Sequence, residues 1–491
     1  MKMKHLSLAV MLMGGAVAVL SSQALAAGYQ FGSQSVSGQG NAHANGAEAN
    51  DPTTIFNNPA GMSRLDGTQI SGGLSLVVPH SSYTDHGSTN LAGQSTGGGN
   101  GGNYAPSVVA APSLYMTTKV NDKINVGLGV FVPYAAKLDY GNEWAGRYSL
   151  ESIDLKTINF NPSISFKFDE HNSVGFGVSA QYMDAELQMA ADSTTGLAQA
   201  YAAKTGASLT QGKAAVAGLG ITGDGVGKIS GNDWGFGWNV GYMFQLDDNT
   251  RFGLAYRSTV KQTLTGSTTW TFDGVHGTIP AAVAGALGLP AQNTPAGVIA
   301  KLKHPNASGS VDVTTPASAS VNFFHQLDPR WAVMGDVTWN ETSKLQEIRI
   351  KQDTVGGVAQ GDLVINQNWK DTYRVSLGAN YRYSDSWLFR TGVAWEQSPV
   401  RSDDLRHPAI PDSDRIWLSL GANYAINKNS SIDLAYSFID FKDANTNYHD
   451  TCSPIGVSPS TGQACTGNGE TTRGTYKTYL HLVGVQYNYR F

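Results

Sequence analysis

The 491-residue chain has few charged residues and, beyond its first thirty residues, no long hydrophobic run. Charged residues make up 14% of it, where about 25% is usual for globular proteins. No later segment approaches the roughly 20 apolar residues of a membrane-spanning helix, which argues against a helical membrane protein. The eleven histidines are scattered and neither H-E-x-x-H nor C-x-x-C occurs, so we expect no metal and no cofactor. A net charge of −5 argues against a nucleic-acid partner.

Cysteine is also scarce, and the two that occur, Cys452 and Cys465, lie close together near the end of the chain. In an oxidising compartment we expect them to pair within one loop, and two free thiols are the alternative. The start of the chain predicts such a compartment. Lys2 and Lys4, an apolar stretch over residues 6–20 and an A-x-A site ending at Ala26 are typical of a secretory signal, residues 1–26. A membrane anchor is the alternative, but this apolar stretch is short for one.

The rest of the chain is rich in glycine and tyrosine, with 57 and 21 residues, which suits a β-rich protein with many turns. Short turns rich in Asp, Asn and Ser alternate with longer connections along its whole length. That alternation is typical of a membrane barrel with short periplasmic turns and long extracellular loops. Fourteen strands are predicted, near residues 67–83, 105–119, 123–139, 148–168, 172–190, 231–247, 250–272, 310–327, 330–350, 363–384, 386–398, 413–427, 430–442 and 475–491.

The faces of these strands agree with a barrel. Within 413–427, Ile416, Leu418 and Leu420 share one parity, while Ser419 and Gly421 take the other. This is the apolar-out, polar-in alternation of a membrane strand. The chain ends on alternating Val483, Val485, Tyr487, Tyr489 and Phe491, which resembles the C-terminal signal of outer-membrane barrels. A soluble sandwich with one buried face is the alternative, but it does not require long and short loops to alternate.

Residues 27–66 are small, polar and Gly-rich, which fits neither a strand nor an amphipathic helix, and a flexible tail is one interpretation. They contain Asn58-Pro59-Ala60, which resembles the NPA motif of the FadL family of outer-membrane long-chain fatty acid transporters. Three further blocks, 231–258, 371–400 and 411–415, are similar to the same family of Gram-negative bacteria. The resemblance implies an all-β, membrane-spanning 14-stranded antiparallel barrel over 67–491, with residues 27–66 as an N-terminal plug inside its lumen.

The resemblance also implies a function, the passive uptake of long-chain fatty acids across the outer membrane by a monomer in contact with outer-membrane lipid. Pro133 falls inside the third predicted strand, where a proline cannot donate to the ladder. A bulge near the rim is one interpretation of it. By resemblance, an interruption at Pro133, Tyr134, Ala135 and Ala136 opens the wall sideways and lets ligand leave into the membrane. Pro162 is a second strand proline.

A fatty acid head group needs a cation, and the resemblance favours Arg349, with Lys344 second and the aromatic Tyr29 near the ligand. An ordinary basic residue near the rim is the alternative for Arg349. Asp184 is acidic at a family position for the head group, which is a departure. Two long loops, 191–230 and 273–309, are apolar for exposed segments. They are expected either to capture substrate or to hold short helices that bury their apolar sides on each other.

Three rival functions remain open. The same architecture serves for other hydrophobic compounds, such as aromatic hydrocarbons. A closed surface barrel acting as an adhesin or phage receptor belongs to a different class. An outer-membrane hydrolase is a third, since Gly93-Gln94-Ser95-Thr96-Gly97 matches G-x-S-x-G, but that motif needs a strand and a helix around the serine and here lies in a Gly-rich loop. We therefore expect no enzyme.

Overall fold

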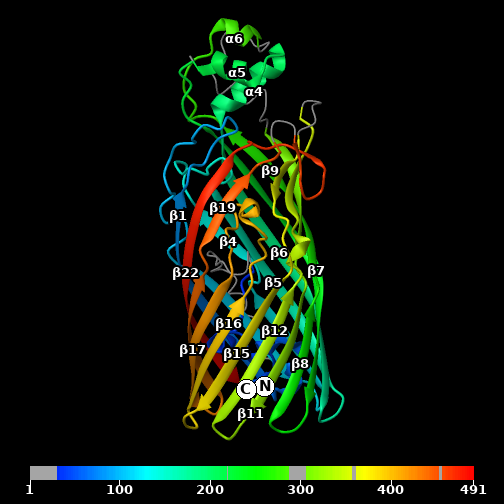
Figure 1. The fold of residues 1–491 in the computed structure, drawn as a ribbon. Coiled ribbons are helices and arrows are strands. Elements are labelled where there is room, and N and C mark those ends of the chain that lie inside the picture. The colour runs from blue at the N-terminus through cyan, green and yellow to red at the C-terminus, as the bar shows by residue number, and fades with distance from the viewer. Residues whose placement is uncertain (1–29, 218, 287–305, 356–360, 453–455) are drawn as a thin grey trace.

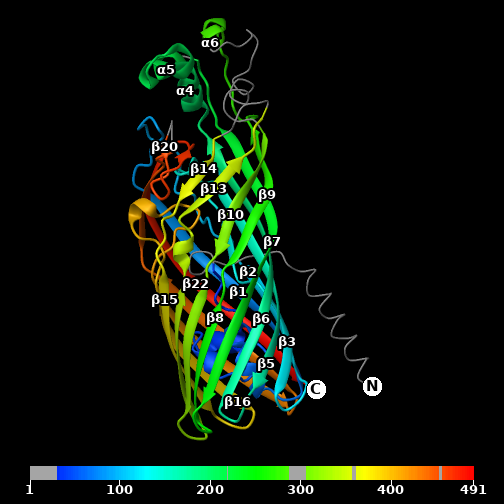
Figure 2. The same cartoon turned by 90° about the vertical axis from the view of Figure 1, so that its right-hand side faces the viewer.

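The computed structural model describes residues 30–491 except 218, 287–305, 356–360 and 453–455. The chain forms a closed antiparallel barrel of fourteen wall strands (Figures 1 and 2). Neighbouring wall strands pair in sequence order, and the first strand pairs with the last from Gln69↔Arg490 to Asp85↔Gly474. The predicted signal, residues 1–26, and Tyr29 lie outside the described residues.

Eight wall strands are single segments and six are divided in two. The single segments are β1 (Thr68–Asp85), β2 (Val109–Lys119), β5 (Ser152–Lys167), β6 (Asn172–Ala191), β7 (Gly225–Gln245), β16 (Trp387–Glu396), β17 (Arg415–Asn427) and β22 (Thr471–Arg490). The divided strands are β3 (Ile124–Phe131) with β4 (Ala135–Asp139), β8 (Thr250–Arg257) with β9 (Val260–Thr271), β10 (Ala307–Thr315) with β11 (Ser318–Gln326), β12 (Trp331–Asn340) with β13 (Glu347–Gln352), β14 (Leu363–Asn366) with β15 (Thr372–Arg382), and β18 (Ser430–Phe441) with β19 (Ala444–His449).

These divisions correct several predicted strands. The strand predicted over 330–350 stops at Asn340, and a short 3-10 helix, η4 (Thr342–Lys344), follows before β13. Lys344 therefore lies in a helix and not in a strand. Pro316 separates β10 from β11, because its ring nitrogen cannot donate to a ladder. Pro162 stays inside β5, but the pairing of β5 with β6 skips from Phe160↔Ala180 to Ser163↔Gly177 beside it.

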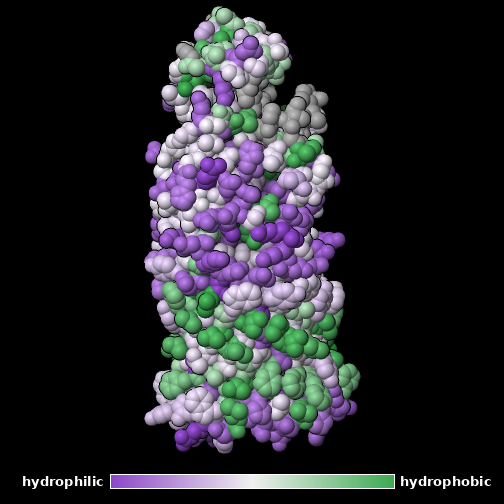
Figure 3. All heavy atoms as spheres, in the orientation of Figure 1, coloured by the Kyte–Doolittle hydropathy of each residue, from purple (hydrophilic) through white to green (hydrophobic). Residues whose placement is uncertain are grey.

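The outer surface carries an apolar band around the end with the short turns (Figure 3). On β7, Phe236 is 75% exposed, and aromatic pairs such as Trp331–Tyr381 and Trp387–Tyr424 lie near the turns. Above the band the wall is hydrophilic on the face that Figure 3 shows. The band is the part in contact with lipid, because apolar and aromatic side chains face outward only where water is absent. The other half of the barrel extends beyond the membrane.

Short helices lie at the far end of the barrel, opposite the short turns (Figure 1). They are α4 (Ser193–Thr205), α5 (Leu209–Ala217) and α6 (Ala281–Ala286). Leu197, Val216 and Ala284 are buried together against Trp270 and Phe272 at the end of β9. The helices thus bury apolar sides on one another, as one of the two interpretations of these loops expects. Of the described helices, none is long and apolar enough to cross a membrane.

The N-terminal segment, residues 31–65, lies inside the barrel near its turn end (Figure 2). Its short helices are α2 (Val36–Gly40), η2 (Asn45–Ala47), α3 (Thr54–Asn57) and η3 (Pro59–Arg64). Nearly every residue of the segment is buried. Its contacts go to strands on all sides, since α2 meets β17, β18 and β22 while η3 meets β5, β6 and β7. The polar character of the segment is explained by this position, because the lower lumen is polar.

Candidate functional site

The polarity of the lumen changes along the barrel, and β5 shows how. On its inner face Asn159 and Asn161 lie low in the lumen, while Ile153 and Leu155 lie at the far end and line a cavity. The outer face of β5 is apolar in the membrane band, but in the far half it carries the charged Lys156. The alternation has inverted, because the far half stands in water outside and encloses an apolar space within.

The upper cavity is this apolar space, and it encloses roughly 800 Å³ including its mouth. Among the described residues that line it, none is charged. Side chains from seven strands meet there, together with two from loops: Ala136, Ile153, Leu155, Ala185, Leu187, Ile229, Leu264, Val311, Val313, Leu345, Ile348, Ile350 and Ile410. Such a space suits a flexible apolar ligand, because each buried CH₂ contributes about 0.8 kcal/mol.

A second space, the lower cavity, separates the N-terminal segment from the wall and measures roughly 850 Å³. Polar and charged groups line it, among them Arg257, Arg374 and Asp336. The Arg257 guanidinium donates to the carbonyl of Phe56 at 3.2 Å, and Arg374 lies 3.6 Å from the Asp336 carboxylate. The lower cavity therefore suits water and polar groups, in contrast to the upper one.

The interruption between β3 and β4 lies between the two cavities. Pro133 and Tyr134 line the lower cavity, and Ala136 lines the upper one. Tyr134, Ala135 and Ala136 are all buried. The interruption predicted at this position is thus present, and its residues connect two spaces of opposite polarity.

The wall beside the interruption has an incomplete ladder. β2 pairs with β3 only from Lys119↔Asn125 to Leu114↔Val130. The remainder of β2, residues 109–113, pairs with β1, and within the described chain no pairing joins it to β4. On the other side both β3 and β4 pair with β5. In the described chain, the seam between β2 and β4 is therefore not closed by strand pairing.

The N-terminal segment is hydrogen-bonded to the interruption itself. The Phe31 amide donates to the Pro133 carbonyl at 2.8 Å, and the Gln34 side chain donates to the Val132 carbonyl at 2.5 Å. Gln30 and Tyr134 form an isolated β-bridge. The start of the N-terminal segment is therefore tied to the carbonyls of Val132 and Pro133, which do not pair with a neighbouring wall strand.

Asn58, Pro59 and Ala60 anchor the other end of the segment. The Asn58 side chain accepts from the Ala60 amide at 3.1 Å and donates to the carbonyls of Tyr242 at 3.1 Å and Leu254 at 3.3 Å. The neighbouring wall strands carry glycines at the contact: Gly175, Gly241 and Gly253. A Cβ at Gly241 would stand 2.0 Å from the Asn58 oxygen, so only glycine admits this approach.

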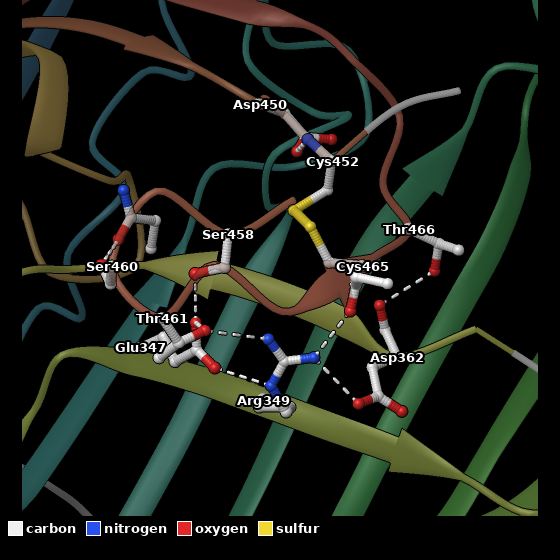
Figure 4. Close-up of a disulfide and its surroundings, with 12 residues drawn as sticks. Glu347, Arg349, Asp362, Asp450, Cys452, Ser458, Ser460, Thr461, Cys465 and Thr466 are labelled. Carbon is white, nitrogen blue, oxygen red and sulfur yellow. Dashed lines mark hydrogen bonds and ion pairs between the residues drawn. A yellow bond between two sulfur atoms is a disulfide. The ribbon is translucent and has the colours of Figure 1, made fainter. Parts of the chain in front are cut away.

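The predicted head-group residues lie apart from the upper cavity. Ile348 and Ile350 line the cavity, whereas Arg349 between them is on the opposite face of β13. Its guanidinium bonds to Glu347 at 2.6 Å, to Asp362 at 2.9 Å and to the Ala464 carbonyl at 3.0 Å (Figure 4). Lys344 is half exposed and pairs with Glu341 at 3.1 Å. Asp184, the acidic departure from the family, pairs with Lys156 on the outer wall.

Cys452 and Cys465 are joined in a disulfide, with their Cα atoms 5.1 Å apart. The disulfide closes the last loop, and Figure 4 shows that loop lying over Arg349. Ser458 and Thr461 of the loop bond to Glu347. Arg349 and Glu347 thus hold the loop on β13.

Sequence reasoning named none of the upper-cavity residues except Ala136. The alternation of the fourth predicted strand contained a signal for this cavity. Ile153 and Leu155 lie on the same face as the polar Asn159, whereas the charged Lys156 lies on the otherwise apolar face. Ser95 of the hydrolase-like motif lies in a loop, without the strand and helix that a nucleophile elbow needs.

A closed barrel with an apolar outer band, a filled lower lumen and an apolar inner cavity defines the class of outer-membrane barrels that conduct hydrophobic compounds. The model of the outer membrane protein transport protein family (OMPP1/FadL/TodX) matches residues 17–491. The chain belongs to this family of outer-membrane transport proteins.

Individual relatives agree. A putative outer membrane protein of Neisseria meningitidis serogroup B is 34% identical over 486 residues, 98% of each chain. The long-chain fatty acid transport protein of Escherichia coli O6:H1 is 32% identical, over 86% of this chain and 89% of that one. A solved Pseudomonas aeruginosa FadL homologue has a TM-score of 0.76 at 24% identity, covering 95% of this chain and all of its own. The Pseudomonas putida toluene transporter TodX has a TM-score of 0.60 at 18% identity, over 90% and 94% of the two chains.

Proposed function

We infer that the protein takes up long-chain fatty acids across the outer membrane by passive diffusion. Relatives that cover most of the chain are named as long-chain fatty acid transport proteins. The upper cavity supports this reading, because its apolar lining suits a chain of many CH₂ groups. The loops that carry α4 to α6 are the proposed capture site at the extracellular end, and capture requires the helices to separate and expose the apolar sides that they bury on one another. The concentration gradient of the ligand drives the transfer.

The ligand leaves sideways through the seam between β2 and β4. The observation that carries this is the position of Pro133 to Ala136, between the two cavities and beside a stretch of β2 that pairs with β1 but has no partner strand on the side of β4. Small Ala135 and Ala136 leave room there. A hydrophobic product that passes this seam enters lipid directly and avoids the polar lower lumen.

Arg349, Lys344 and Tyr29 are the proposed head-group residues. Because Arg349 is paired with Glu347 and Asp362, it reaches a carboxylate only if the last loop shifts and one of these partners is exchanged. A plug movement then accompanies release, since the N-terminal segment is bonded to the interruption. Asn58, Pro59 and Ala60 hold the fixed end of that plug, residues 27–66.

Mass spectrometry of the lipid that co-purifies with the native barrel tests the substrate class. We expect long-chain fatty acid in wild-type protein and binding of oleate but not of toluene. Ile229→Asp places a carboxylate in the upper cavity and should weaken oleate binding by at least roughly tenfold, because desolvating a charge is costly. Asn232→Asp, exposed on the same strand, is the matched control. Preferential binding of toluene would mean that the substrates are aromatic hydrocarbons and not fatty acids. Binding of neither ligand would favour a closed surface barrel.

A further inference from the structure

A basic hollow opens at the turn end of the barrel, which is the periplasmic end. It spans roughly 880 Å³, counted together with the open space at its mouth, and lies between the N-terminal segment and the wall. Arginines from five separate parts of the chain line it: Arg64, Arg251, Arg330, Arg382 and Arg490. The acidic residues among its lining are Glu48 and Asp66. Positive charge therefore exceeds negative charge in this hollow.

Three of these arginines already have partners. Arg251 is buried, donates to the carbonyls of Ala47 at 2.6 Å and Glu48 at 2.9 Å, and lies over the Phe324 ring. Arg64 donates to the side chain of Gln245, and Arg490 lies 3.8 Å from Asp66. These contacts hold the N-terminal segment but leave much of the positive charge uncompensated. Glu48 in turn accepts from Asn380 at 2.7 Å.

Arg330 and Arg382 differ from these three. Both are exposed, and in the part of the chain that the structure describes neither has a carboxylate within 4 Å. Their backbones are joined, since the Arg382 amide donates to the Arg330 carbonyl at 2.8 Å. The two guanidinium groups thus lie on adjacent wall elements, the β11–β12 turn and the end of β15, and face the hollow that Arg64 enters from the other side.

Several guanidinium groups around one hollow repel one another unless an anion neutralises them. The planar guanidinium fork matches phosphate oxygens in pairs, which is why arginine is preferred for phosphate recognition. An anion that reaches both Arg64 and the Arg330–Arg382 pair would connect the N-terminal segment to the wall.

We propose that the basic hollow binds a small anion of the phosphate class from the periplasm and that the bound anion fastens the N-terminal segment to the barrel. The inference goes beyond uptake of hydrophobic compounds and does not depend on which compound is carried. The phosphate group has two possible sources, a free phosphate of the periplasm and the head group of a phospholipid. Both present non-bridging phosphate oxygens to the arginines.

The test is titration of the purified full-length barrel with inorganic pyrophosphate in low salt, followed by calorimetry. Arg330→Ala with Arg382→Ala should weaken binding by roughly 10- to 100-fold, as expected for lost charge-assisted hydrogen bonds. Lys123→Ala removes an exposed cation of another periplasmic turn and should leave binding unchanged. Competition by monomeric dihexanoyl-phosphatidylglycerol would identify a lipid head group as a source, and its absence would leave free phosphate.

A second readout separates fastening from mere association. Hydrogen exchange over residues 46–66 should slow when pyrophosphate is added to wild-type protein and should not respond in the double variant. Absence of pyrophosphate binding, equal binding by the double variant, or unchanged exchange in the wild type would each overturn the proposal. Oleate binding, measured on the same samples, reports on the proposed function separately.

Discussion

At the scale of single residues, the contact between Asn58 and Gly241 shows how tightly the N-terminal segment is fitted to the wall. Asn58 is completely buried and its side-chain amide satisfies three backbone groups on three chain segments. A buried amide of this kind is costly to displace, because the carbonyls it serves lose their donor.

Gly241→Ala should therefore destabilise the segment. The new Cβ would stand 2.0 Å from the Asn58 oxygen, so the side chain must move and its hydrogen bonds weaken. We expect a loss of about 1–3 kcal/mol, measured by thermal unfolding in detergent, with the barrel still assembled. Gly72→Ala is the matched control, since the nearest atom to its Cβ, Leu114 Cδ1, is 3.8 Å away. Equal melting of the two variants would contradict this account.

Glu470, beside the disulfide loop, is a second residue with a specific consequence. It is buried next to Asp450, and one of its oxygens accepts from Ser149 at 2.6 Å while the other has no partner among the described residues. Burial, and then the neighbouring Asp450, raise the pKa of Glu470 from 4.5 to about 8. Between pH 4.5 and about 8, Glu470 therefore keeps its proton in the folded loop and loses it in the unfolded chain.

A carboxyl whose pKa is raised on folding makes the folded form less stable as pH rises from its unfolded to its folded pKa. The last loop should thus become easier to open between pH 4.5 and about 8 and change little above that. Hydrogen exchange of the loop as a function of pH measures it. Glu470→Gln should remove the dependence, and Glu143→Gln, exposed in a neighbouring loop, should not. A loop that opens more readily at acidic pH would refute the assignment.

At the scale of elements, the interruption of the third wall strand is the feature on which the proposed exit depends. Pro133 provides no amide hydrogen. Residues 109–113 of β2 have no ladder partner on the side of β4 among the described strands. Strand pairing closes the rest of the wall, so its absence between β2 and β4 makes this seam the weakest part of the wall near the cavities.

Pro133→Val returns the amide and favours extended pairing, and Ala136→Trp fills the space beside it. Each should lower fatty acid uptake by cells while oleate binding to the purified Pro133→Val barrel persists. Ala136 lines the upper cavity, so uptake by the tryptophan variant must be compared with wild-type uptake at equal occupancy of that cavity by oleate. Pro162→Val is the control, a strand proline away from both cavities. Uptake that survives both changes would mean that ligand leaves through the lumen.

At the scale of the whole molecule, the barrel is divided into an apolar upper space and a polar lower lumen filled by the N-terminal segment. The segment contacts strands on every side, so it both closes the lumen and links the interruption to the wall opposite. Loosening its anchor should therefore change conduction and uptake together.

Changing Asn58 and Pro59 both to Ala should leave the barrel assembled, because the wall strands pair without them. We expect higher ion conductance in planar bilayers, as the segment no longer seals the lumen, and lower fatty acid uptake. Wild-type conductance and uptake in this double variant would show that the segment is not a gate.

The sequence alone determined the barrel, its fourteen strands and its outer-membrane placement. These follow from local features, namely the period-two alternation, the alternation of short and long connections and the C-terminal aromatics. Even the interruption at Pro133 is local, since one missing amide donor is a property of one residue. The Asn58-Pro59 turn belongs to the same group, because the side chain bonds to the amide two residues on.

Tertiary structure decided which residues meet. The upper cavity draws on seven strands, the basic hollow takes its arginines from residues 64 to 490, and Arg349 turns to a loop more than 100 residues away. These groupings depend on strand register and on where the barrel leaves the membrane. The inversion at Ile153 and Leu155 was visible in the sequence, but its meaning was not. Only the folded barrel shows that Lys156 is exposed on the outside, paired with Asp184, and that the apolar face of this half lies within.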